Sequence, residues 1–284
     1  FSFFKGTTKE INGLVATGLI NFNSRQETYI MHPLVRSLVL GCLPTDTIKA
    51  LHIKVSEYFS KKYSFKHIDD KDRHFVERKV VYHLIKGEEY DLAAIHIGRI
   101  GTRFISFNTI DEMEEILIEL ESKKISDQGQ AWLINIKAHL ADFRKSFNLT
   151  GKMYHQMLEL AKKSKNIEII ALATNNVGAT YRRTGKFKDA NKLFLAAYKI
   201  ALKNNFTKIQ GTALNNLAQS YAYLKRYKEA VKTFERCVQV RSFDRDEFRL
   251  AATLSHFGNL CLSIYEQSKF NLDQKEFLGK SWEY

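Results

Sequence analysis

Apolar and small side chains recur in the second half of the chain with a step of 40 residues. Residues 171–181 (ALATNNVGATY) align with residues 211–221 (GTALNNLAQSY), and a third copy begins at Ala251. The following positions keep the step, with an aromatic residue, an alanine and a phenylalanine at Phe187, Ala190 and Phe194 and again at Tyr227, Ala230 and Phe234. Apolar residues three and four apart favour helices over strands, so each copy predicts two amphipathic helices joined by a turn.

At these positions the sequence resembles the tetratricopeptide repeat, a helix-turn-helix unit with small and aromatic residues at fixed offsets. The resemblance implies helical hairpins that stack, because one hairpin alone cannot bury its apolar face. Gly178 and Ala218 fall where the first helix approaches its neighbour. The step of 40 residues exceeds the usual ~34, so longer helices or longer connections are expected. A degenerate copy is expected over Ala131–Lys163.

Residues 46–125 show the same order of elements with a weaker consensus. Val80–Leu84 is followed by Gly87, Tyr90 and Ala93, which again reads as helix, glycine turn, aromatic residue and alanine. We therefore expect irregular helical hairpins here.

The first 45 residues have a different pattern. A helix is expected to end near Gly18, segments 19–22 and 28–31 alternate as in a β-hairpin, and Pro33 is placed to begin the next helix. Helix, hairpin and helix in this order predict the back half of a winged helix. The expected fold is thus mainly α, with a partial winged helix over 1–45, degenerate helical hairpins over 46–125 and a tetratricopeptide superhelix over 126–284. The expected core residues are Leu34, Leu38, Tyr181, Ala190, Phe194, Tyr221, Ala230 and Phe234.

This order of domains resembles the region that follows the nucleotide-binding core in STAND signal-transduction ATPases, which include the NB-ARC proteins. The residues that carry the resemblance are 18–20 (GLI) and 29–34 (YIMHPL). It implies that His32 contacts a nucleotide phosphate, although Pro33 stands where the family has aspartate. The alternative is that His32 is an ordinary residue at a helix start. The chain has no GxxxxGK[ST] loop, so we expect no enzyme activity and no cofactor in it, with ADP or ATP bound only by a longer parent.

The net charge of +13 is concentrated in residues 151–250, which hold 20 basic and 8 acidic side chains. In such repeats the first helix of each hairpin lines the groove, where amides can pair with a peptide backbone and arginine with carboxylates. The expected ligand contacts are Asn175, Arg182, Arg183, Asn215, Gln219, Tyr223 and Asn259. The bound segment is expected to be acidic. The alternative is that the asparagines are typical of the repeat and that the basic side chains are solvated or lie on the convex side.

Other classes of site are disfavoured by the sequence. The cysteines Cys42, Cys237 and Cys261 have no CxxC or metal-ligand spacing, which favours a reducing, cytoplasmic compartment and no metal. No apolar stretch is long enough to span a membrane. Residues 1–45 hold only two more basic than acidic side chains, so DNA is not the expected partner.

The expected function is that of a non-catalytic sensor and scaffold arm of a STAND-like ATPase. Its repeats would bind a protein or peptide and relay that binding to a nucleotide switch in a parent that can oligomerise. The alternatives are a peptide-responsive transcription regulator that binds DNA, or a plain assembly adaptor.

Overall fold

The computed structural model describes residues 15–17, 20–23, 28–31, 33–64, 69–244 and 247–267. Over this part the chain is mainly helical, which confirms the predicted fold class. The chain divides into two compact units, Phe1–His96 and Ile97–Tyr284. The predicted domain limits at residues 45 and 125 stay predictions.

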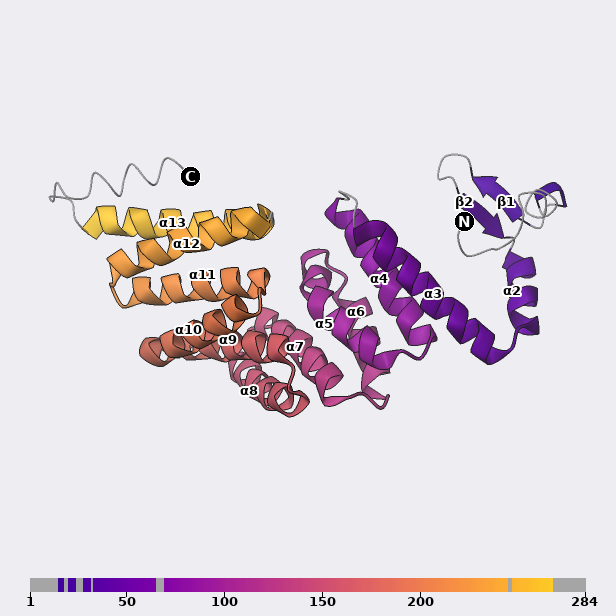
Figure 1. Cartoon of the computed structure of the whole chain (residues 1–284), viewed down its shortest axis with the longest axis horizontal. Helices are drawn as coiled ribbons and strands as arrows, with labels where there is room; N and C mark the ends of the chain where they lie inside the picture. The colour runs from indigo at the N-terminus through magenta and orange to yellow at the C-terminus, as the bar shows by residue number, and fades with distance from the viewer. Residues whose placement is uncertain are drawn as a thin grey trace. The chain divides into compact units, whose positions relative to one another are not determined.

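The first unit contains a β-hairpin followed by a helix. Strands β1 (Ile20–Asn23) and β2 (Thr28–Met31) pair antiparallel, with Ile20 opposite Met31, and helix α2 (Pro33–Cys42) begins at the proline (Figure 1). The predicted hairpin and helix start are therefore confirmed, while the winged helix stays a prediction. Leu34 and Leu38 were predicted to be core residues, and this was wrong. They are 75% and 69% exposed because the apolar stripe of α2 lies at the surface.

The same unit continues with a helical hairpin. Helices α3 (Thr45–Ser64) and α4 (Asp70–Lys86) pack together, and α4 ends where the backbone N–H of Gly87 bonds the carbonyl of His83. Helix α5 (Tyr90–Ser106) follows this turn. The helix, glycine turn and helix expected around residue 87 are thus present.

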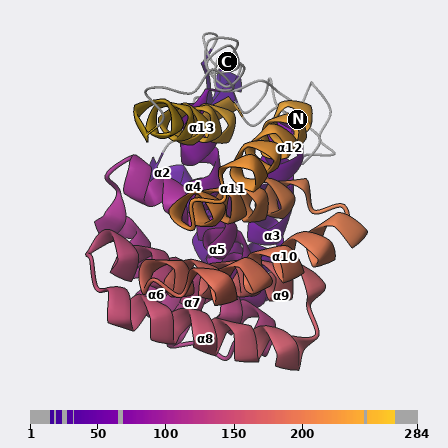
Figure 2. The same cartoon turned by 90° about the vertical axis from the view of Figure 1, so that its left-hand side faces the viewer.

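The second unit is a stack of helices that follow one another in chain order (Figures 1 and 2). After the end of α5 they are α6 (Ile110–Glu121), α7 (Asp127–Phe143), α8 (Phe147–Ser164), α9 (Ile167–Arg183), α10 (Phe187–Lys203), α11 (Thr207–Tyr223), α12 (Tyr227–Asp244) and α13 (Glu247–Gln267). Each helix from α7 to α13 packs against the next.

The length of the repeat follows from the length of its helices. Helices α9, α10 and α11 have 17 residues each. They are joined by short turns at 184–186 and 204–206, and a residue with positive φ recurs in the turns at Lys145, Lys165, Gly185, Asn205 and Lys225. Long helices with tight turns, rather than long connections, therefore account for the 40-residue step.

The interior of the stack is built from the residues that repeat. Ala190, Phe194 and Ala230 are fully buried and Phe234 is 1% exposed, as predicted, while Tyr181 and Tyr221 are half-buried at the edges of these clusters. A Cβ atom added to Gly178 would lie 2.8 Å from the ring of Phe194. The small residue is needed because the second helix of the hairpin comes this close.

Candidate functional site

The first helices of successive hairpins form a continuous layer. Helix α7 contacts α9, α9 contacts α11, and α11 contacts α13. We call these four helices the first-helix layer, and α8, α10 and α12 the second helices. All seven groove residues expected from the sequence belong to the first-helix layer.

Asparagine side chains link this layer from helix to helix. Asn176 of α9 donates to Oδ1 of Asn135 of α7 at 3.1 Å, and Asn216 of α11 donates to Oδ1 of Asn175 at 3.1 Å. Asn175 and Asn176 are joined to each other at 3.2 Å, and Asn135 donates to the carbonyl of Gly98. Amides that are withdrawn from water must be paired, and here they pair with one another.

Two of the expected ligand contacts lie in or beside this asparagine ladder. Asn175 is only 2% exposed and uses both ends of its amide within the ladder. Asn215 is 8% exposed and its Oδ1 lies 3.2 Å from Nδ1 of His256 on α13. The structure therefore places both side chains between helices, where they join one repeat to the next.

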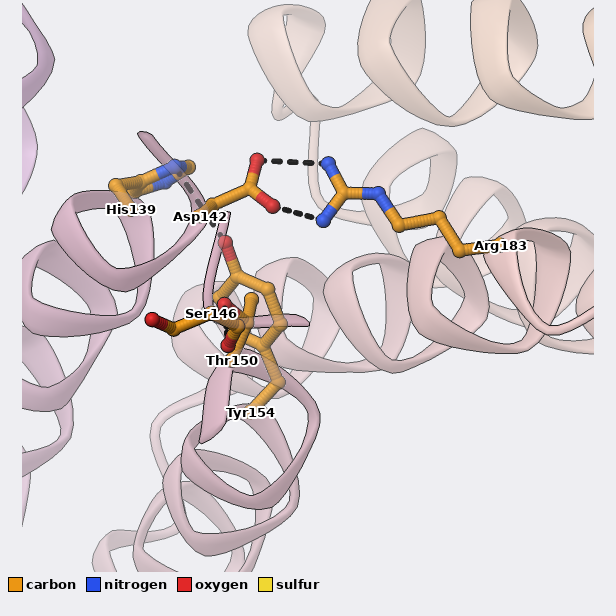
Figure 3. A network of polar contacts seen from close by, with 6 residues as sticks. All are labelled: His139, Asp142, Ser146, Thr150, Tyr154 and Arg183. Atoms are coloured by element: carbon orange, nitrogen blue, oxygen red, sulfur yellow. Dashed lines mark hydrogen bonds and ion pairs between the residues drawn. The ribbon is translucent and has the colours of Figure 1, made fainter. Parts of the chain in front are cut away.

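Arg183 pairs with an acid of the chain itself. Its two terminal nitrogens donate to the two carboxylate oxygens of Asp142, with Nη2 at 2.7 Å from Oδ2 (Figure 3). The guanidinium also lies over the ring of Phe147, 5.0 Å from its centre. The hydrogen bond that Arg183 donates to Asp142 raises the pKa of Arg183. Arg183 thus joins α9 to α7 and the start of α8.

A partly buried histidine lies beside this ion pair. The hydroxyl of Tyr154 on α8 is 3.4 Å from Nδ1 of His139 on α7 (Figure 3). Burial lowers the pKa of His139 to about 4, and the neighbouring Asp142 opposes this shift only in part. Burial also raises the pKa of Tyr154. Both groups are neutral at pH 7, and they hold α7 against α8.

Arg182 has no such acidic partner among the residues that the structure describes. Its Nη1 donates to Oε1 of Gln219 on α11 at 2.5 Å, and its Nε is buried with no hydrogen-bond partner among the described residues. Burial lowers the pKa of Arg182, and the positive charge of Arg183 lowers it further. Nε2 of Gln219 in turn lies 3.2 Å from Nδ1 of His256. Arg182, Gln219 and His256 therefore form a polar row across α9, α11 and α13, which we call the arginine row.

The remaining predicted contacts are at the surface or outside the described part. Tyr223 is 64% exposed and stacks on Phe187, with ring centres 5.1 Å apart. Asn259 of α13 is exposed. His32 lies outside the described residues, so its nucleotide contact stays a prediction.

Much of the positive charge lies off the first-helix layer. Exposed lysines of the second helices are Lys152, Lys162, Lys163, Lys188, Lys192, Lys199, Lys203, Lys228 and Lys232. Some of these residues have acidic neighbours, since Lys162 pairs with Glu159 and Lys192 with Asp189. The excess of basic residues therefore does not by itself mark the groove.

Several partners of the expected residues were not identified from the sequence. They are Asp142, His256, Asn135, Asn176 and Asn216. A signal was present in the spacing. The ladder contacts between helices and the Arg183–Asp142 pair join residues 41 apart, and neighbours in the arginine row are 37 apart. These separations differ from the repeat length by one residue or about one helical turn.

Two other kinds of site are absent from the described part of the chain. None of its helices has the length and apolar character that crossing a membrane requires. Within the same residues, no three histidine, cysteine, aspartate or glutamate side chains are grouped so that they could hold a metal ion.

Comparison with solved structures shows several helical-repeat proteins with a similar fold. BtubC (BKLC) from P. vanneervenii has 15% identity and a TM-score of 0.47, over 85% of this chain and 94% of that one. PH0952 from Pyrococcus horikoshii, a STAND protein with a tetratricopeptide repeat sensor, has 14% identity and a TM-score of 0.46, over 98% of this chain and 58% of that one.

A Rap protein complexed with competence and sporulation factor has 17% identity and a TM-score of 0.50, over 88% of this chain and 72% of that one. No curated protein matches the sequence. The tetratricopeptide repeat family model matches residues 211–244, which lie in α11 and α12. The repeat inferred from the 40-residue step is thereby confirmed for this hairpin.

Proposed function

We propose that the chain is a non-catalytic sensor and scaffold arm that binds a protein or peptide along its first-helix layer. The observation that carries this proposal is an internally paired ladder with polar and aromatic side chains beside it that are exposed or, for Arg182, keep a donor without a partner among the described residues. Asn175 and Arg183 are satisfied by the chain itself, whereas Arg182, Tyr223 and Asn259 present polar or aromatic surface. A surface of this kind supplies aromatic anchors and hydrogen bonds to an extended partner.

The second part of the proposal is that binding at the repeats is relayed to a nucleotide switch. The arm belongs to a STAND-like ATPase of the cytoplasm, and binding at the repeats shifts a nucleotide switch in the parent, which holds ADP or ATP and can oligomerise. The order of segments along the sequence supports this, as does the stacked architecture, in which each first helix contacts the next. A phosphate-binding loop encoded upstream of Phe1 in the gene is expected. A complete DNA-binding domain there would favour a transcription regulator instead, and a start codon close to Phe1 would favour an adaptor.

Binding along the first-helix layer can be tested with the full 284-residue chain. A library of random displayed peptides is panned against the chain, and the selected peptides are synthesised and titrated by isothermal calorimetry. Tyr223→Ala combined with Asn259→Ala should lower affinity about tenfold or more, since truncated aromatic anchors cost this much at interfaces. The matched control is Phe243→Ala, which removes a side chain that is 85% exposed on the second helix α12.

The two variants distinguish binding at the first-helix layer from binding at the second helices. Affinity that falls in the Tyr223 and Asn259 variant and is unchanged in Phe243→Ala supports the first-helix layer. Affinity lost only in Phe243→Ala, or a panning experiment that yields no peptide with saturable binding, contradicts the proposal.

A further inference from the structure

The arginine row contains a cation whose ion-pair partner is missing from the described part of the chain. Arg182 is partly withdrawn from water, and its one hydrogen bond to a described residue goes to the neutral Gln219. A guanidinium has five N–H donors, so most of those of Arg182 have no partner in the described part of the chain. A desolvated charge without a counter-charge is unfavourable, and an acidic group would relieve this cost.

The hydrogen bonds of the row have a definite direction. Because Arg182 can only donate, Gln219 must accept through its oxygen and turn its amide nitrogen toward Nδ1 of His256. Nδ1 of His256 is then a hydrogen-bond acceptor, and the proton of the neutral imidazole is on Nε2. The amide of Asn215 lies beside the same Nδ1. It can donate to that nitrogen as well, because a flip of an asparagine amide exchanges its oxygen and nitrogen. The row therefore ends in N–H donors at both Arg182 and His256.

His256 is exposed on α13, and its surroundings favour the neutral ring. Partial desolvation lowers the pKa of His256, and the charges of Arg182 and Arg241 lower that pKa further. The site thus offers one fixed positive charge together with a neutral donor, which matches a group with a single negative charge and two acceptor oxygens.

We infer that Arg182, Gln219 and His256 form a binding site for one carboxylate group of the peptide that occupies the first-helix layer. The inference rests on the proposed function and names the chemistry of its ligand. Arg183 is not part of this site, because its donors already hold Asp142. The Arg183 pair shows within the same protein how a carboxylate sits on a guanidinium of α9. The carboxylate can come from an acidic side chain or from a peptide C-terminus.

The site can be tested directly with small probes. The full chain is labelled with ¹⁵N-arginine, and the Nε–H signal of Arg182 is assigned by its loss in Arg182→Gln. Acetyl-Gly-Glu-Gly-amide supplies only a side-chain carboxylate, acetyl-Gly-Gly-Gly with a free acid supplies only a terminal one, and acetyl-Gly-Gln-Gly-amide is the neutral control. Titrations are done at constant ionic strength. At least one carboxylate probe should move the Arg182 signal saturably, and the neutral probe should not.

A variant that loses the same charge elsewhere on the chain distinguishes a specific carboxylate site from general electrostatic attraction. Arg182→Gln should weaken binding of the carboxylate probe about tenfold or more, because a bidentate charge-assisted contact is lost. Arg236→Gln removes the same charge from the exposed face of α12, where Arg236 lies over the ring of Tyr198. It should weaken binding less than about twofold, since distant exposed charges are screened by salt. Thermal unfolding of both variants is measured to check that they are folded.

The results that would overturn the inference are specific. They are an Arg182 signal that neither carboxylate probe moves, or equal losses of affinity in Arg182→Gln and Arg236→Gln. Panned peptides that bind Arg182→Gln as tightly as the unmodified chain, yet lose affinity in the Tyr223 and Asn259 variant, would contradict the carboxylate site. They would leave the groove function standing.

Discussion

Lowering the pH should destabilise the second unit through His139. Its pKa in the folded chain is about 4, against 6.5 for an unperturbed histidine, because burial disfavours the charged ring. The unfolded chain therefore binds a proton more readily than the folded chain. The stability that the neutral ring contributes is complete above pH 6.5 and is lost as the pH falls from 6.5 toward 4. Linkage gives a loss of about 2 kcal/mol at pH 5, rising to about 3 kcal/mol below pH 4.

The assay compares the intact chain with His139→Gln, which keeps a polar partner for the hydroxyl of Tyr154 but does not titrate. Urea unfolding is followed at pH 7.5 and pH 5 by the fluorescence of Trp132, which lies in the same helix α7 and is 4% exposed. Both proteins carry Trp282→Phe, so that a single tryptophan reports. Other groups titrate in both proteins, so the difference between the two losses isolates His139.

Between pH 7.5 and pH 5 the chain with His139 should lose about 2 kcal/mol more than the variant. Equal losses would refute the reasoning, because they would mean that the ring is protonated in the folded chain, or is solvated there, without cost. A larger loss in the variant would contradict it as well.

The remaining predictions concern packing and can all be checked by thermal or urea unfolding. Gly258→Ala in helix α13 should stabilise the chain by up to about 1 kcal/mol, because the added methyl meets nothing within 4 Å and alanine favours a helix. Gly185→Ala should instead destabilise it by about 1 kcal/mol, since the space is equally open but φ is +77°. Ala190→Leu should cost about 1 to 3 kcal/mol through overpacking against Phe194 and Leu217, and unchanged melting would contradict the repeat register.

The repeat and its core could be predicted because they depend on local spacing. Small and aromatic residues at fixed offsets identified Ala190 and Phe194 as buried, and the structure confirms both. The apolar stripe of α2 gave the opposite result, because a stripe shows which face of a helix is apolar but not whether anything covers it. Leu34 and Leu38 are exposed for this reason.

The turns were only partly visible in the sequence. Residues with positive φ recur every 20 positions from Lys145 to Lys225, yet only Gly185 and Asn205 are types that favour this conformation. The three lysines at the other turns carry no such signal. Helix packing holds them in place, so the tight turns and the length of the 17-residue helices could not be inferred from residue type alone.

The candidate site was harder to predict than the core. Its residues were selected because they are polar or aromatic and lie on first helices, and the sequence did not show which other side chains they contact. Two adjacent arginines looked equivalent in the sequence, but on a helix they are 100° apart around the axis. Arg183 therefore reaches back to α7 and meets Asp142, while Arg182 reaches forward to α11 and meets Gln219. Which of the two remains available to a ligand depends on these long-range partners.

The asparagine ladder also explains why the arginine row can exist. Buried amides contribute little net stability, since apolar residues of similar size would pack as well, but a mispaired buried amide is costly. Sliding α9 along its neighbours by a single turn would break the contacts of Asn176 with Asn135 and of Asn216 with Asn175 together. The ladder thus fixes the register of α7, α9 and α11. Because Asn215 extends the same polar contacts to His256, the register of α13 is fixed too, and the donors of Arg182 and His256 are held in one row.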